Sequence, residues 1–96
     1  MSTLETAFQE EMSAGHSAAW DQDWESAITH YKKALGVMPD QPRALVNLGL
    51  AYYEKEDFDE SLVWYQKAIE VSPTDPFPRE KAAEIFERVG KLQDFI

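Results

Sequence analysis

The apolar positions of this chain recur at the spacing of an α-helix, and no stretch alternates with the period of two that is typical of a strand. The pattern is clearest on either side of the charged residues 54–57. The apolar residues before and after them are Leu45, Leu48, Gly49 and Tyr52, then Phe58, Leu62, Tyr65, Ala68 and Ile69. We therefore predict two helices joined by a short turn in this part of the chain.

Polar residues and prolines mark where several helices begin and end. Asp40 is expected to cap the helix that precedes the charged turn, with Pro42 in its first turn. Pro73 is expected to end the helix that follows the turn, because proline cannot donate to the helical hydrogen-bond ladder. Ser2 and Glu5 form a capping-box pattern at the start of the first helix.

The rest of the chain gives three further helices. The first is expected to end near Trp20, with a turn at 21–23 and a second helix over 24–37. Asp75 and Pro76 predict the start of a fifth helix that ends near Gly90. Residues 91–96 are then at most a short, frayed sixth helix.

An internal repeat with a period of about 34 residues organises these helices, since residues 8–41 align with 42–75 without a gap. A third unit begins at Pro76 and is incomplete. The identical pairs are Gly15/Gly49, Asp23/Asp57, Tyr31/Tyr65, Lys33/Lys67, Ala34/Ala68, Val37/Val71 and Pro39/Pro73. Each unit is a pair of helices, and such a pair must stack on a neighbour to bury its apolar face.

The recurring small, aromatic and proline positions resemble those of the tetratricopeptide repeat (TPR) family. The second unit matches the family pattern well and departs from it at Ser61, where the family prefers alanine. The first helix is atypical, because Glu11, Ala14 and Ala18 stand where large apolar residues are usual. The matching residues of the second unit are Leu45, Leu48, Gly49, Tyr52, Tyr65, Ala68 and Pro73.

The resemblance implies an all-α solenoid of helical hairpins in a right-handed superhelix, with five helices and a short or frayed sixth. One domain would span residues 1–96, with repeats at 8–41 and 42–75 and a partial repeat at 76–96. It also implies a non-catalytic module that binds a peptide or helix of a partner protein in its concave groove. Self-association, or a place within a longer scaffold, is the alternative.

Composition and charge narrow the class of partner. The chain has 96 residues, no cysteine and a net charge of −9, so disulfides and thiolate metal sites are excluded, and nucleic acid and anionic membranes are unfavourable partners. No apolar run is long enough to span a membrane, and the first residues lack the pattern of a secretory signal. We expect a soluble, cytoplasmic protein whose partner is a protein or peptide.

The sequence offers no constellation for catalysis or for a bound cofactor. His16 and His30 fall on different helices, and neither has a second histidine at helical spacing. The acidic residues 54–60 lack the spacing of a calcium loop. We therefore predict no catalytic residue, no metal site and no cofactor.

The helix over 42–54 carries a second apolar stripe, Val46, Leu50 and Tyr53, offset from the stripe that packs within its hairpin. In the TPR family this second stripe faces the groove, although Val46 and Leu50 could equally pack between adjacent helices. The expected groove residues are Met12, His16, Trp20, Arg43, Val46, Asn47, Leu50, Tyr53, Phe77 and Lys81.

Some TPR domains hold a C-terminal carboxylate with a clamp of lysine, asparagine and arginine side chains. The corresponding positions here are Met12, His16, Asn47, Phe77 and Lys81. Only Asn47 and Lys81 have suitable chemistry, so this clamp is predicted to be largely absent.

A second candidate surface lies at the C-terminal edge, where apolar residues have no following helix to cover them. Its residues are Phe86, Leu92, Phe95 and Ile96. Exposed apolar surface of this kind usually marks an interface. The sequence therefore predicts weak homodimerisation through this edge.

Overall fold

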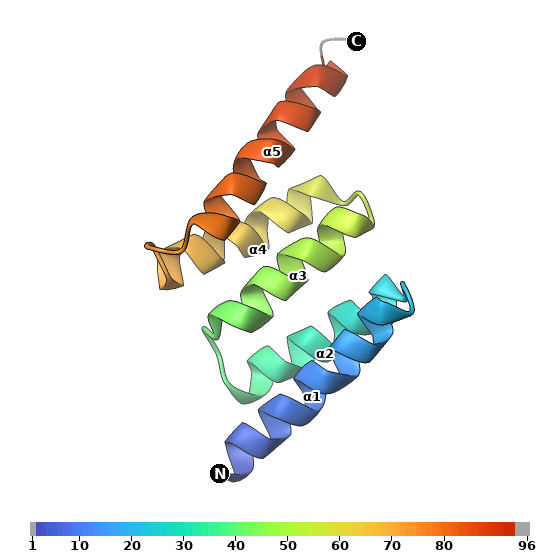
Figure 1. Ribbon diagram of the computed structural model, residues 1–96, viewed down its shortest axis with the longest axis vertical. Helices are drawn as coiled ribbons and strands as arrows, with labels where there is room; N and C mark the ends of the chain where they lie inside the picture. Colours follow the sequence, from blue (N-terminus) through green and yellow to red (C-terminus); the bar gives the residue numbers. More distant parts are fainter. Residues whose placement is uncertain (1, 94–96) are drawn as a thin grey trace.

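The structure is a computed structural model that describes residues 2–93, including the side chains of residues 2–90. Five α-helices and no strand are found in this part of the chain: α1 (Thr3–Trp20), α2 (Trp24–Val37), α3 (Pro42–Glu54), α4 (Phe58–Val71) and α5 (Pro76–Gln93). They stack in chain order along the longest dimension, so α1 and α5 lie at opposite ends (Figure 1). The predicted all-α fold is confirmed.

Two repeated contacts set the spacing of the helices within each hairpin. A methyl group added at Gly15 would lie 2.5 Å from Cε1 of Tyr31, and one added at Gly49 would lie 2.7 Å from Cε1 of Tyr65. Both rings are buried. The absence of a side chain at each glycine therefore lets a tyrosine from the second helix pack against the first, as the repeat predicts.

The second unit has a serine at position 61, where the TPR family prefers alanine, and the structure shows how its hydroxyl is accommodated. Its side chain is fully buried, and its hydroxyl donates a 2.7 Å hydrogen bond to the carbonyl oxygen of Gly49. A buried hydroxyl costs free energy unless it is bonded. The bond satisfies this hydroxyl and ties α4 to α3 beside the Tyr65 contact.

Side-chain caps start four of the five described helices, including α5, where Asp75 accepts from the Phe77 amide at 3.0 Å. The other three caps share one pattern. Ser2 Oγ accepts from the Glu5 amide at 3.1 Å, and Asp23 and Asp57 accept in the same way from the amides of Ser26 and Glu60. Each bond satisfies a backbone donor that the helix itself leaves free.

The predicted cap of α3 is wrong. Gln41 occupies the N-cap position without a side-chain bond, and Asp40 adopts a left-handed conformation with φ of 62°. Short polar side chains tolerate this conformation better than most residues. Asp40 therefore turns the chain between the two hairpins instead of capping the helix.

The fifth helix continues through Gly90 to Gln93 instead of ending near Gly90. A methyl group at Gly90 would meet no atom within 4 Å, and no proline follows to interrupt the helix. A glycine in this setting costs roughly 1 kcal/mol relative to alanine, which is too little to stop a helix. Residues 91–93 belong to α5, and the remainder of the expected sixth helix lies outside the described residues.

Candidate partner-binding face

The first helices of the three units, α1, α3 and α5, form one face of the molecule, which we call the α1–α3–α5 face. Two hydrogen bonds join its members: Asn47 Nδ2 lies 3.2 Å from His16 Nε2, and Arg88 donates to the Tyr53 hydroxyl at 2.7 Å. Neighbouring helices on this face are therefore close enough for their side chains to interact.

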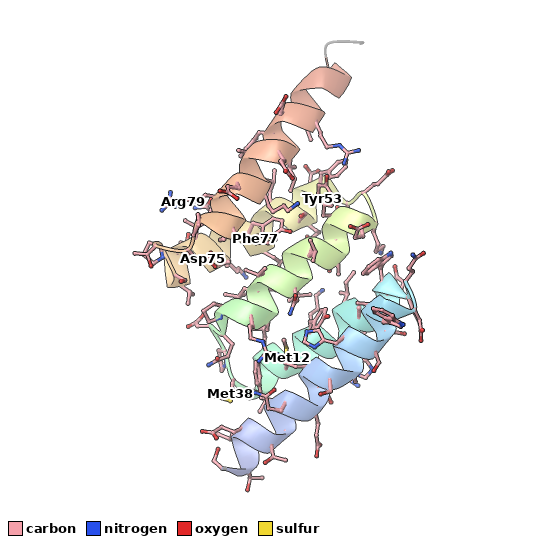
Figure 2. The ribbon with its side chains drawn as sticks, viewed as in Figure 1. Met12, Met38, Tyr53, Asp75, Phe77 and Arg79 are labelled. Atoms are coloured by element: carbon pink, nitrogen blue, oxygen red, sulfur yellow. The ribbon has the colours of Figure 1, made fainter. Side chains whose placement is uncertain are left out.

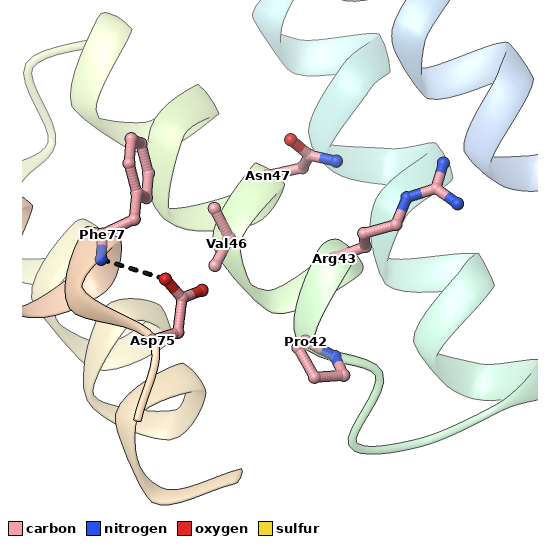
Figure 3. A pocket seen from close by; sticks show the side chains of 6 residues that line it. All are labelled: Pro42, Arg43, Val46, Asn47, Asp75 and Phe77. Carbon is pink, nitrogen blue, oxygen red and sulfur yellow. Dashed lines mark hydrogen bonds between the residues drawn. The ribbon is translucent and has the colours of Figure 1, made fainter. Parts of the chain in front are cut away.

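A pocket of about 330 Å³ opens between α3 and the start of α5. Val46 points toward Phe77 and Asp75, while Arg43 and Asn47 extend from α3 toward the first hairpin (Figure 3). Pro42 completes the lining. Apolar walls beside a few polar groups are the usual composition of a site that binds an organic group.

The start of α5 is held in place on one side of this pocket. Asp75 Oδ1 accepts from the Phe77 amide at 3.0 Å, and the Phe77 ring packs edge-on against buried Tyr65 at 6.5 Å between centroids. Phe77 still has 37% of its surface exposed. The ring is thus fixed in position but open to a ligand.

Aromatic rings and cations cover the junction of α3 and α5 at the far end of the face, where Tyr53 lies (Figure 2). The Lys81 ammonium lies 5.6 Å from the Tyr53 ring and 5.7 Å from the Phe77 ring, and it also bonds Glu84 at 3.2 Å. The Arg88 guanidinium lies over the rings of Tyr53 and Phe58. Sequence reasoning left Arg88 out of the groove set, although it falls at helical spacing from Phe77 and Lys81.

His16 lies at the other end of the face, between α1 and α3. Partial burial, and secondly the positive charge of Arg43, hold the pKa of its imidazole below the usual 6.5. At neutral pH the ring is therefore uncharged. Its Nε2 then accepts the hydrogen bond from Asn47.

The expected groove residues do not all lie on this face. Met12 is wrong as a groove residue: its side chain is 1% exposed and packs in the core with Phe8 and Ala44. Trp20, at the end of α1, is instead almost fully exposed to solvent, with 88% of its surface accessible. Val46, Asn47, Leu50, Tyr53 and Lys81 are half-buried, and Arg43 is exposed.

The residues expected at the C-terminal edge can be placed only in part. Phe86 is 66% exposed on α5. Phe95 and Ile96 lie outside the described residues, as does the side chain of Leu92. Phe86 is therefore the part of this surface that the structure describes.

The described residues contain neither a cluster of metal ligands nor a membrane-spanning helix. No group of three or more acidic or histidine side chains within the described part could hold a metal ion. No helix among the described residues has the length and apolar character needed to cross a bilayer.

Comparison with protein families identifies the fold. A family model described as tetratricopeptide repeat matches residues 42–75, and a second, described as TPR repeat, matches residues 21–56. The chain belongs to the TPR family, which confirms the resemblance seen in its sequence, and it is a protein-interaction module of this class.

Similar curated proteins come from Prochlorococcus and Synechococcus strains. Photosystem I assembly protein Ycf3 of Prochlorococcus marinus (strain NATL2A) is 43% identical over 56 residues, which are 51% of this chain and 32% of that protein. The protein of the same name from Synechococcus sp. (strain WH7803) is 30% identical over 83 residues, which are 83% of this chain and 48% of that protein. The matched region thus spans between about a third and about half of the length of these relatives.

Proposed function

We propose that the α1–α3–α5 face binds a peptide or helix of a partner protein and that the chain carries out no catalysis. The pocket between α3 and α5 carries this proposal, because it is an open hollow of about 330 Å³ with apolar walls and polar groups beside them. A side chain of a partner segment would enter between Val46 and Phe77. Arg43 and Asn47 would bond its backbone or a polar group.

Aromatic and basic residues that are exposed or half-buried extend this surface beyond the pocket. Tyrosine, tryptophan and arginine are enriched among the residues that anchor protein partners. Tyr53 and Arg88 lie at one end of the face, and Trp20 is exposed at the end of α1. A bound segment would therefore run along the face across α3.

The relatives suggest the class of partner. Their name describes them as assembly proteins of photosystem I. We infer that this chain likewise holds a protein subunit during the assembly of a larger complex.

The experiment compares two matched substitutions of an apolar residue by glutamate. Leu50→Glu changes the α1–α3–α5 face, while Val63→Glu changes an exposed position on α4, where Val63 is 46% exposed. A partner captured from lysate with the wild-type chain is purified, and its affinity for each variant is measured by calorimetry. We expect Leu50→Glu to weaken binding at least tenfold and Val63→Glu to change it less than twofold.

Thermal melts of the same variants separate binding from folding. A small change in melting temperature for Leu50→Glu supports the groove assignment, whereas a large loss shows that Leu50 packs in the core, because a buried carboxylate costs several kcal/mol. In that case Phe77→Ala and Arg43→Ala, which change exposed pocket residues, replace it in the binding assay. Unchanged affinity in both would overturn the proposal.

A further inference from the structure

One side of α5, which we call its open side, carries Ala83 and Phe86. No described helix packs on it, whereas α2 and α4 pack on the equivalent sides of α1 and α3. Figure 1 shows α5 at the end of the stack, with α4 on one side of it. Pro78 and Ile85 are fully buried on that side. Ala83 is exposed on the opposite side, and Phe86 is 66% exposed there.

The two complete hairpins show what this side of a helix normally contacts. Ala83 occupies the repeat position of Gly15 and Gly49, each of which receives a buried tyrosine ring from the next helix. Phe86 occupies the position of Tyr52, which is 8% exposed. Among the described residues, this side of α5 thus has a small residue where a ring normally packs and, one turn later, an exposed ring.

These two features are complementary to each other. If two copies of α5 pack antiparallel about a twofold axis that passes between residues 84 and 85, residue 86 of each copy lies opposite residue 83 of the other. The exposed phenylalanine then covers the small alanine, as Tyr65 covers Gly49 within the second hairpin. A twofold interface requires this self-complementarity.

The charge of α5 is less unfavourable to a second copy than the average charge of the molecule. The molecule as a whole carries −9, but α5 has four basic residues, Arg79, Lys81, Arg88 and Lys91, against three glutamates. Two copies that approach through α5 therefore do not bring strongly acidic surfaces into direct contact.

We propose that the chain forms a weak symmetric homodimer in which Phe86 of each copy packs on Ala83 of the other. This interface lies on the side of α5 that faces away from Phe77 and Lys81, so it leaves the proposed partner-binding face open. Failure of one proposal does not entail failure of the other.

Sedimentation velocity of the full chain, up to about 1 mM, tests the dimer. The wild-type mass should rise from 11.0 kDa toward twice that value. Phe86→Ala and Ala83→Glu should each weaken association at least tenfold, while Val63→Glu, an apolar-to-acidic change at an exposed position of α4, should not. A wild-type chain that stays monomeric, or a dimer that Phe86→Ala leaves unchanged, would overturn the proposal.

Disulfide trapping tests the antiparallel register, because the natural chain has no cysteine. In the proposed dimer residue 79 of one copy lies opposite residue 90 of the other, whereas like residues are about 16 Å apart along the helix axes. A mixture of Arg79→Cys and Gly90→Cys chains should form a covalent dimer under mild oxidation, and each variant alone should not. Equal crosslinking of the single variants would contradict this register.

Discussion

Tyr31 and Tyr65 determine how closely the two helices of each hairpin approach. Each ring lies where the facing glycine leaves room, and burial raises the pKa of both phenols. Because Tyr65 is fully buried, its ring cannot swing into solvent to admit a larger neighbour. The stability of the hairpin should therefore be sensitive to a single methyl group at Gly49.

Gly49→Ala is predicted to lower the free energy of unfolding by about 1–3 kcal/mol, because the new methyl group forces the ring and the two helices apart. Gly49→Leu should destabilise the fold further. Gly36→Ala is the matched control, since a methyl group there meets no atom within 4 Å. Chemical denaturation should show that this control is unchanged or more stable by up to about 1 kcal/mol.

His16 should titrate below the usual 6.5 of an imidazole, because burial and then the charge of Arg43 disfavour its protonated form. Because its pKa is lower in the native state, the native protein takes up this proton at lower pH than the unfolded chain. His16 therefore destabilises the fold as the pH falls through 6.5 and below. NMR titration of the ring protons measures its pKa. Arg43→Ala should raise that value only in part, since burial is the larger cause.

Met12 shows where residue-level prediction from the sequence reached its limit. Its repeat position is the same as that of Val46, which borders the open pocket, so sequence spacing assigned both to the groove. A long, flexible methionine can fill gaps that a valine cannot reach. Met12 accordingly lies in the core with Phe8, and no periodic pattern distinguishes the two outcomes.

The start of each second helix depends on one aspartate. Asp23 and Asp57 are equivalent in the repeat, and their carboxylates accept from the amides of Ser26 and Glu60. Asp57→Ala should therefore cost about 1 kcal/mol of stability. Asp59→Ala, an exposed neighbour that makes no cap, is the control. Equal losses in thermal or chemical denaturation would show that helix charge, and not the cap, is responsible.

The sequence predicted the element boundaries well where a side chain or proline marks them. The predicted second helix over 24–37 is observed as Trp24–Val37, and Pro76 begins α5. The sequence misassigned the helix cap at Asp40 and the helix end at Gly90. Both depend on backbone conformations that several residue types can adopt. A left-handed turn at Asp40 and a continuous helix through Gly90 each cost about 1 kcal/mol, which neighbouring contacts can outweigh.

Charge is unevenly distributed over the whole molecule. The chain carries −9, and α1 has acidic residues and no basic one, whereas Arg43 lies on α3, and Lys81 and Arg88 lie on α5. Lys81 is already bonded to Glu84, and Arg88 to Tyr53. The part of the α1–α3–α5 face formed by α3 and α5 is therefore less acidic than α1 without being strongly basic.

This distribution predicts that an acidic C-terminal peptide of the kind held by clamp-type TPR domains binds poorly. The positions that such a clamp requires carry buried Met12, an uncharged His16 and Phe77, which leaves Asn47 and the already paired Lys81. Two carboxylates would lose their hydration without adequate charge compensation, while the net charge of −9 repels the peptide at longer range. Calorimetric titration at physiological salt, with a complete clamp domain as positive control, should detect no binding at low micromolar concentrations. Low-micromolar affinity for this chain would contradict the prediction.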